Sequence, residues 1–298
     1  MSNDTVYQIV TEQIIEKLAA GVAPWRKPWS GGAGPAMMPT NLISKKRYTG
    51  INALLLSLNS FSSPYYLTFK QCQGLGGKVK KGSKSSVVCF WKFLDRPANE
   101  EGGDQDDSKV SNYRPAMLRY YRVFNVEQCE NLDKHIPAAT VTEGGEFNPI
   151  EEAARIIEGM PQRPVIVHKE QRAFYSPRKD SINLPKPESF DSPSHYYGTA
   201  FHELTHSTGH ESRLNRPGVS NTEKLAPFGS EDYSKEELVA ELGSAFLCAM
   251  AGITDTIEPS ASYLQSWLNV LKADSKMIVS AASQAQKAAD FILGINQN

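Results

Sequence analysis

Two histidines and a glutamate stand close together in segment 200–206, whose sequence is AFHELTH. On an α-helix, a spacing of four residues places His202 and His206 on the same face, where both rings can bind one metal ion. Glu203 lies beside them as a candidate general base. The pattern is typical of a zinc-peptidase active site. The alternative is an amphipathic helix with two surface histidines, which would need no partner elsewhere in the chain.

A catalytic zinc ion usually has three protein ligands and one open position for water, so a third ligand is required. Glu237 and Glu241 share one face of an apolar helix expected over 234–246. One carboxylate could bind the metal while the other orients a histidine ring. Glu237 could instead belong to a capping box at the start of that helix, whereas apolar neighbours favour Glu241 as a buried partner. His210 continues the four-residue spacing, but a glycine before it is expected to break the register.

The chemistry expected from this site is hydrolysis of a peptide bond. A bound metal would activate water, and Glu203 would take up the proton as the substrate carbonyl is attacked. A side chain that stabilises the oxyanion is also expected, and the candidates are Tyr233, Tyr263 and His210. The expected cofactor is a divalent metal, with zinc as the first choice and manganese as the alternative.

The neighbouring segments fit a helix beside the edge of a sheet. Ser194 is expected to cap the helix and Gly209 to end it. Upstream, strands are expected at 165–168, 173–175 and 181–185, the last two joined by a polar turn. A sheet edge next to a metal-bearing helix could hold an extended peptide by strand addition.

Charge is distributed unequally along the chain, although the net charge at pH 7 is only −1. The first 98 residues contain 13 Lys and Arg against 4 Asp and Glu, whereas the rest contains 19 against 29. All six histidines lie in the acidic part. Metal chemistry and positive charge are therefore segregated, which indicates two functions, and the basic part favours a polyanionic partner.

Aromatic side chains accompany the cations of the basic part. Aromatic residues interleaved with cations suit stacked, unpaired bases, so single-stranded DNA is the expected partner. The alternative for the two tryptophans of segment 24–29 is that they anchor a loop onto the core. The candidate DNA-binding residues are Trp25, Arg26, Lys27, Trp29, Lys45, Lys46, Arg47, Tyr48, Lys78, Lys80, Lys81 and Lys84.

These patterns predict an α+β protein with two domains. A basic N-terminal α/β domain that binds single-stranded DNA is expected over 1–136, a linker over 137–148, and a peptidase-like domain over 149–298. The second domain is expected to begin with a helix over 149–158 and to be packed by one or two helices over 260–293.

The first domain is expected to contain an N-terminal helix and a long hairpin. An amphipathic helix is expected to follow a polar cap at Asn3 or Asp4 and to end at Gly21. The acidic segment 97–108 is expected to be a flexible connection within a long hairpin, because 118–126 has a strand pattern that could pair with 87–94.

Cysteine usage and hydropathy indicate the compartment. The four cysteines form no C-x-x-C pair and lie mostly in apolar runs, so buried free thiols of a reducing compartment are expected. The beginning of the chain lacks a targeting signal, and no run of eighteen apolar residues occurs. A cytoplasmic location without a membrane partner is therefore expected.

The sequence as a whole resembles the plasmid-encoded ArdC-type antirestriction proteins, whose N-terminal domain is shared with certain conjugative plasmid primases. The resemblance covers nearly the whole chain. Its first half rests on IIEKL (14–18), GVAPWRKPW (21–29), YTGIN (48–52), LTFKQ (67–71) and KGSK (81–84). Its second half rests on HELTH (202–206), TG (208–209), RL (213–214) and EELVAE (236–241).

The resemblance implies a single-strand-binding N-terminal domain, a C-terminal zincin-like metallopeptidase domain, and protection of incoming plasmid DNA from host restriction during conjugation. By resemblance to Glu-type zincins, Glu237 binds the metal and Glu241 supports a histidine. The implied partners are single-stranded DNA and either a protein substrate or a host restriction component. The alternative function is a site-specific or self-cleaving metalloprotease that is recruited to DNA, with proteolysis as its main activity.

Overall fold

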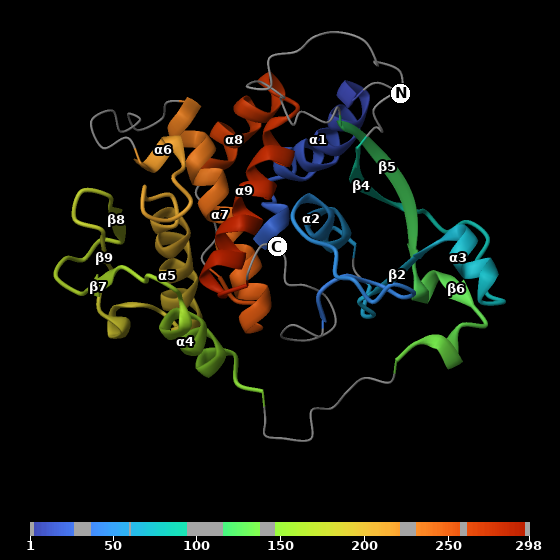
Figure 1. Cartoon of the computed structure of the whole chain (residues 1–298), viewed down its shortest axis with the longest axis horizontal. Helices are drawn as coiled ribbons and strands as arrows, with labels where there is room; N and C mark the ends of the chain where they lie inside the picture. The colour runs from blue at the N-terminus through green and yellow to red at the C-terminus, as the bar shows by residue number, and fades with distance from the viewer. Residues whose placement is uncertain are drawn as a thin grey trace, which may run out of the picture.

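The structure is a computed structural model that describes residues 3–26, 37–59, 61–93, 116–137, 147–220, 231–256 and 261–295. Helices are combined with small, mainly antiparallel sheets, as expected for the predicted α+β class (Figure 1). The first half contains α1 (Asn3–Ala19), η1 (Pro24–Arg26), β1 (Thr40–Asn41), α2 (Ile51–Ser57), β2 (Tyr65–Thr68), α3 (Phe69–Gly74), β3 (Lys78–Val79), β4 (Ser86–Phe93), β5 (Ala116–Asn125), η3 (Val126–Gln128), β6 (Cys129–Glu130) and η4 (Asp133–His135).

The second half is mostly helical around a small sheet. Its elements are α4 (Pro149–Gly159), β7 (Val165–Val167), β8 (Phe174–Ser176), β9 (Ser181–Asn183), η5 (Pro187–Ser189), α5 (Pro193–Ser207), α6 (Pro217–Ser220), α7 (Glu231–Ala251), α8 (Ala261–Ala273) and α9 (Met277–Ile292). The helix predicted over 149–158 is confirmed, and of the one or two helices predicted over 260–293 the structure has two.

The N-terminal half contains a four-stranded sheet in the order β1-β2-β5-β4. The long pair β4 and β5 is antiparallel, with register from Ser86 opposite Val123 to Phe93 opposite Ala116. The predicted pairing of these two segments is confirmed. The acidic segment 97–108 lies outside the described residues.

Helix α1 packs its apolar stripe into the core because its apolar residues recur at helical spacing. Val10, Ile14 and Leu18 are fully buried. The helix begins at Asn3, so it already includes the two residues that were predicted as its cap. Gly21 follows its end with a φ of 78°, a left-handed conformation that glycine adopts without a steric penalty.

The C-terminal half contains the three predicted strands in the order β7-β9-β8. β9 pairs with β7 in parallel and with β8 antiparallel, so β8 is an edge of this sheet. The helix that follows begins differently from the prediction. Ser192, not Ser194, is the N-cap of α5: its side chain accepts a hydrogen bond from the backbone N–H of His195, and Pro193 occupies the first turn.

The two halves share one hydrophobic core, which runs from α1 to α9. Trp25 and Trp267 pack edge to face with ring centroids 5.2 Å apart. The backbone N–H of Gly50 donates to the Gln286 side chain at 2.9 Å, which joins α2 to α9. The last two helices therefore pack on both halves, not on the second alone (Figure 1). The predicted domain boundaries stay a prediction, because most of the linker lies outside the described residues.

All four cysteines are free and buried, as predicted. Burial raises the pKa of Cys89 to about 11 and that of Cys129 to about 12. Among the described helices, none combines the length and apolar character that a membrane span needs.

Candidate active site

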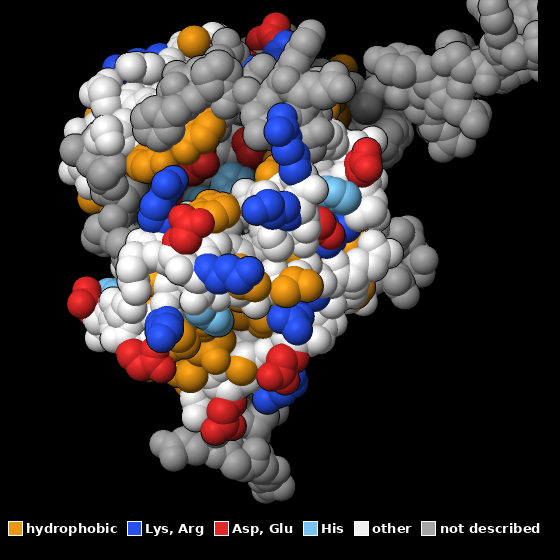
Figure 2. Space-filling view, turned by 90° about the vertical axis from the view of Figure 1, so that its left-hand side faces the viewer, with side chains coloured by type: hydrophobic (Ala, Val, Ile, Leu, Met, Phe, Trp, Pro, Cys, Tyr) orange, Lys and Arg blue, Asp and Glu red, His pale blue; other side chains and the backbone are white. Residues whose placement is uncertain are grey.

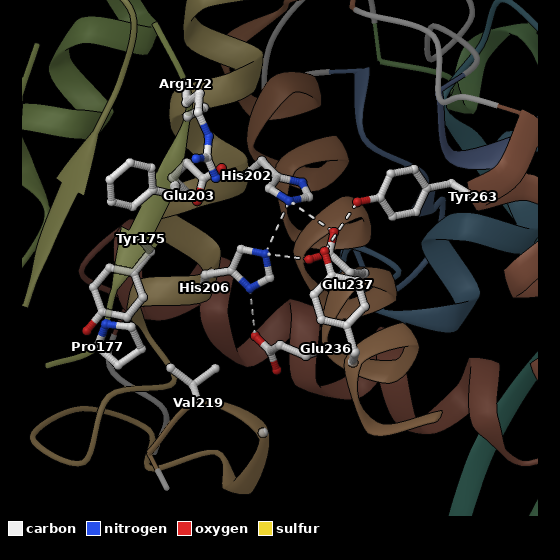
Figure 3. A pocket seen from close by; sticks show the side chains of 14 residues that line it. Arg172, Tyr175, Pro177, His202, Glu203, His206, Val219, Glu236, Glu237 and Tyr263 are labelled. Carbon is white, nitrogen blue, oxygen red and sulfur yellow. Dashed lines mark hydrogen bonds and ion pairs between the residues drawn. The ribbon is translucent and has the colours of Figure 1, made fainter. Parts of the chain in front are cut away.

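Helix α5 presents the two histidines of segment 200–206 on one face. The Nε2 atoms of His202 and His206 lie 3.2 Å apart and point toward the same place (Figure 3). Such an approach is favourable when both nitrogens carry lone pairs directed at one cation. The four-residue spacing therefore brings both histidine rings to one place, as the sequence predicts.

Helix α7 brings a carboxylate to the same place. The Glu237 oxygens lie 3.6 Å from Nε2 of His202 and 3.4 Å from Nε2 of His206. Ligands bound about 2.0–2.2 Å from one ion at tetrahedral angles are separated by about 3.3–3.6 Å. The three side chains form the one group within the described part of the chain that could hold a metal ion, and their spacing fits a divalent cation.

The other nitrogen of each ring faces a second carboxylate. Glu241 lies 3.6 Å from Nδ1 of His202, and Glu236 lies 3.1 Å from Nδ1 of His206. A carboxylate at Nδ1 holds the proton there and leaves the lone pair of Nε2 free for a metal. Each histidine is thus oriented by a different glutamate of α7.

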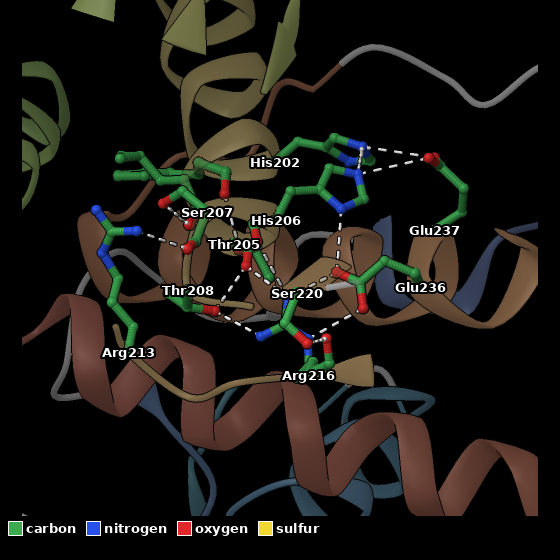
Figure 4. Close-up of polar contacts among 12 residues, drawn as sticks. His202, Thr205, His206, Ser207, Thr208, Arg213, Arg216, Ser220, Glu236 and Glu237 are labelled. Carbon is green, nitrogen blue, oxygen red and sulfur yellow. Dashed lines mark hydrogen bonds and ion pairs between the residues drawn. The ribbon is translucent and has the colours of Figure 1, made fainter. Parts of the chain in front are cut away.

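Glu236 is in turn held by Arg216 (Figure 4). The guanidinium of Arg216 donates to both carboxylate oxygens of Glu236, at 2.6 and 3.0 Å. It also donates to the Thr208 hydroxyl at 2.6 Å and to the Thr205 carbonyl oxygen at 2.8 Å. Because Arg216 is buried, this pair is shielded from water and fixes Glu236 in one orientation.

The electrostatics of the site favour a positive charge at its centre. Burial by itself lowers the pKa of His206, but the carboxylates of Glu236 and Glu237 outweigh burial and hold that pKa well above its usual range. Burial raises the pKa of Glu237, but hydrogen bonds from His202 and His206 outweigh burial and hold it well below its usual range. This negative potential suits a divalent cation.

Helices α5 and α7 can pack closely because the residue of α7 at their contact is glycine, Gly243. A Cβ atom at Gly243 of α7 would lie 2.5 Å from Cγ2 of Thr205 on α5, which is closer than side chains approach. The Thr205 hydroxyl donates to the carbonyl oxygen of Phe201, so this side chain is fixed. The alternative for Glu237, a capping box with Ser234, does not apply, because α7 begins at Glu231 and the Ser234 hydroxyl contacts that of Ser266 instead.

A cavity of about 490 Å³ opens in front of the histidines. On this face of the molecule, histidine and acidic side chains lie at the bottom of a hollow that hydrophobic and cationic side chains border (Figure 2). Glu203 lines the cavity and is buried. The cavity is also lined by Arg172, Ala173, Phe174, Tyr175, Pro177, Gly218, Val219, Tyr233, Glu236 and Tyr263.

The edge strand β8 forms one wall of this cavity. The turn after β8 is fixed to the end of α5, because Arg213 donates to both carboxylate oxygens of Asp180 at 2.8 Å and to the Ser207 carbonyl oxygen at 3.0 Å. Asp180 also accepts a hydrogen bond from the Tyr175 hydroxyl. An extended peptide beside β8 would therefore lie along a rigid edge.

Of the three candidates for oxyanion stabilisation, two line the cavity. The Tyr233 and Tyr263 hydroxyls lie 3.3 Å apart. Burial raises the pKa of both tyrosines, so both hydroxyls keep their protons and can donate hydrogen bonds. His210 instead contacts Ser212 and does not line this cavity.

The candidate DNA-binding residues divide into exposed cations and buried rings. Lys45, Lys46 and Arg47 follow β1, and Lys78, Lys80, Lys81 and Lys84 lie in or after β3; all seven are exposed. Trp25 and Tyr48 are only 2% and 6% exposed, so neither offers a free ring for stacking. For Trp25 the alternative applies, since the ring anchors its segment on Trp267. Lys27, Trp29 and the side chain of Arg26 lie outside the described residues.

Glu236 and Arg216 are site residues that the sequence analysis missed. Glu236 is adjacent to Glu237, and the E-E-x-x-x-E run 236–241 was the available signal. The role of Arg216 has no local signal, because its partner lies twenty residues away along the chain.

Two family models match the chain in succession. The N-terminal domain of the anti-restriction factor ArdC matches residues 4–124, and the zincin-like metallopeptidase matches residues 151–284. The crystal structure of the antirestriction protein ArdC from plasmid R388, in its metal-free form, is 34% identical, covers 96% of both chains and has a TM-score of 0.72. The chain belongs to the ArdC family of antirestriction proteins.

This ArdC-family chain is also similar to a second structure of the R388 protein and to proteins that carry other names. The Mn(II)-bound structure of the same R388 protein has a TM-score of 0.71 and covers 98% of both chains. The uncharacterized protein y4eC of Sinorhizobium fredii (strain NBRC 101917 / NGR234) is 32% identical over 96% of this chain and 91% of its own length. Two Escherichia coli proteins named DNA primase TraC are 37% identical over 98% of this chain, which spans only 20% and 27% of their lengths.

Proposed function

We propose that this protein binds single-stranded DNA through its basic half and protects incoming plasmid DNA from host restriction during conjugation, and that its zincin-like half hydrolyses peptide bonds with a divalent metal. The observation that carries the metal chemistry is the convergence of His202, His206 and Glu237 within 3.2–3.6 Å. These residues are the proposed ligands, and Glu236 and Glu241 are their supports.

Single-strand binding is supported by three features of the first half. Seven exposed cations lie in two groups, one after β1 and the other in and after β3. The N-terminal family model is that of ArdC, and TraC relatives that are named DNA primases share this region. A polyanion would be attracted to such a surface, and its binding would weaken as salt concentration rises.

The proposed hydrolysis assigns a task to each cavity residue. A bound divalent ion supplies Lewis-acid activation of water and of the substrate carbonyl. Glu203 accepts a proton from water and returns it to the leaving amine. The Tyr233 and Tyr263 hydroxyls donate hydrogen bonds to the oxygen that gains negative charge, and β8 aligns the peptide. Zinc is the proposed metal, and the Mn(II)-bound R388 relative supports manganese as the alternative.

A second function is favoured by Glu203 itself. A purely structural metal site usually has four protein ligands and needs no general base. A glutamate that lies beside the proposed ligands and lines the cavity therefore supports the alternative of a protease, recruited to DNA, whose main activity is cleavage of itself or of a host restriction component.

The two functions are separated by the variant Glu203→Gln in a conjugation assay against a restricting host. Metal content and single-strand affinity are measured on the purified variant. Loss of protection with both properties intact makes proteolysis the main activity, whereas retained protection assigns it to the DNA-binding half. The matched control is Glu188→Gln, an exposed glutamate on η5 that should behave as wild type.

A further inference from the structure

The outer face of the β4–β5 pair carries two aromatic rings that no described element covers. Phe90 is 47% exposed and Tyr121 is 44% exposed. Their ring centroids lie 5.8 Å apart at an interplanar angle of 61°. Large aromatic side chains in contact on an exposed sheet face are unusual in a protein without a partner there.

The strand register places cations on the same face as these rings. Phe90 pairs with Arg119, and Tyr121 pairs with Val88 two residues before Phe90. Since alternate residues of a strand point to the same face, Lys92 shares it as well. Arg119 and Lys92 are exposed, and neither strand contains an Asp or Glu.

Buried side chains pack beside the two rings on the same face. Tyr48 is buried with its centroid 6.4 Å from that of Phe90, and Val88 is buried in the same small cluster. The opposite face of the two strands is covered at Cys89 and Leu118, which belong to the main core against α1, whereas Trp91 and Arg122 on that face are exposed (Figure 1). Among the described residues, both faces of this end of the sheet carry exposed side chains, but the face of Phe90 and Tyr121 is the one where two aromatic rings contact each other and a buried ring supports them.

We propose that Phe90 and Tyr121 form a stacking platform for unpaired bases of single-stranded DNA, with Arg119 and Lys92 contacting the phosphates. An exposed aromatic pair flanked by cations, without acidic residues, fits the two components of a single strand, its flat bases and its charged backbone. The inference rests on the proposed single-strand binding and moves the stacking from Trp25 and Tyr48, whose rings are buried, to this face.

The test compares Phe90→Ala and Tyr121→Ala with wild type by fluorescence anisotropy on a labelled oligo(dT). Each change should weaken binding about 5- to 150-fold, since base–aromatic stacking contributes about 1–3 kcal/mol per base. The slope of log Kd against log salt should stay the same, because no cation is removed. Arg119→Gln should lower the magnitude of that slope by about 0.7.

The same strands supply matched controls. Trp91 is 48% exposed but points to the opposite face of β4, so Trp91→Ala should bind as wild type. Arg122 is exposed on the opposite face of β5 and donates to the Ser85 hydroxyl, so Arg122→Gln should leave the slope unchanged. Phe90→Tyr and Tyr121→Phe keep the rings and should retain affinity, which separates stacking from folding.

An abasic oligonucleotide of the same length tests whether the two rings contact bases. The platform requires that wild type and Phe90→Ala bind abasic DNA equally, since no base is present to stack. The proposal is overturned if both Ala variants bind oligo(dT) no more weakly than Trp91→Ala does. It is also overturned if the Ala variants lose as much affinity for abasic DNA as for oligo(dT). If wild type itself does not bind single strands, the proposed DNA-binding function fails as well, which is a distinguishable result.

Discussion

The Oε1 atom of Glu236 lies 3.1 Å from Nδ1 of His206, on the side of the ring away from Nε2. Carboxylates in this position orient the ring, and their removal typically weakens metal binding about 10- to 100-fold. Glu236→Ala should show this weakening in a chelator competition assay. Glu236→Gln, whose amide oxygen can still accept the Nδ1 hydrogen, should be affected less. Equal affinity of Glu236→Ala and wild type would contradict the assignment.

The same substitution tests the buried pair with Arg216. Glu236→Ala leaves the Arg216 guanidinium buried without its carboxylate, and breaking such a pair costs about 3–5 kcal/mol. The free energy of unfolding of the metal-free protein in urea should fall by this amount.

Glu237 and Glu241 should respond differently to removal of their carboxylates. Glu237 faces both Nε2 atoms, whereas Glu241 faces only Nδ1 of His202. Glu237→Ala should therefore abolish stoichiometric metal binding, and Glu241→Ala should weaken it about 10- to 100-fold. Metal content after dialysis, measured by elemental analysis, checks the order. The reverse order would make Glu241 the ligand.

Lys80 and Lys81 test the exposed cations of the basic half. The double change Lys80→Glu with Lys81→Glu should weaken single-strand binding and lower the magnitude of its salt slope by about 0.7 for each phosphate that is no longer neutralised. Titrations at several salt concentrations give both values. The control is Lys272→Glu with Lys287→Glu, an exposed pair on α8 and α9 that changes net charge equally. An identical effect of both pairs would indicate attraction by net charge alone.

Gly243 should not tolerate a methyl group. Alanine normally favours a helix over glycine by about 1 kcal/mol, but here its Cβ would lie 2.5 Å from Thr205. Gly243→Ala should destabilise the protein by about 1–3 kcal/mol and weaken metal binding, because α5 and α7 supply the proposed ligands. Gly198→Ala on α5 is the control, since its nearest contact would be an ordinary 3.7 Å. Urea unfolding and metal affinity distinguish the two.

Much of this fold could be predicted because its signals are local. Strand and helix patterns predicted the β4–β5 hairpin, the strands around the polar turn and the last two helices, since periodicity and turn residues act over a few positions. The N-cap of α5 was misplaced by two residues because Ser192 and Ser194 both flank Pro193, and only the backbone conformation selects between them. Trp25 was assigned to DNA because burial depends on Trp267, which is distant in sequence.

The sequence by itself determined the spacing of His202 and His206, because four residues along a helix fix two side chains on one face. The sequence alone could not decide how Glu236, Glu237 and Glu241 divide their contacts. That division depends on how closely α7 packs against α5 and on the rotation of α7 about its own axis. The absence of a side chain at Gly243 permits this close approach at Thr205. Helix packing, a sum of many contacts between residues far apart in the chain, therefore placed one carboxylate at both Nε2 atoms and the other two behind the rings.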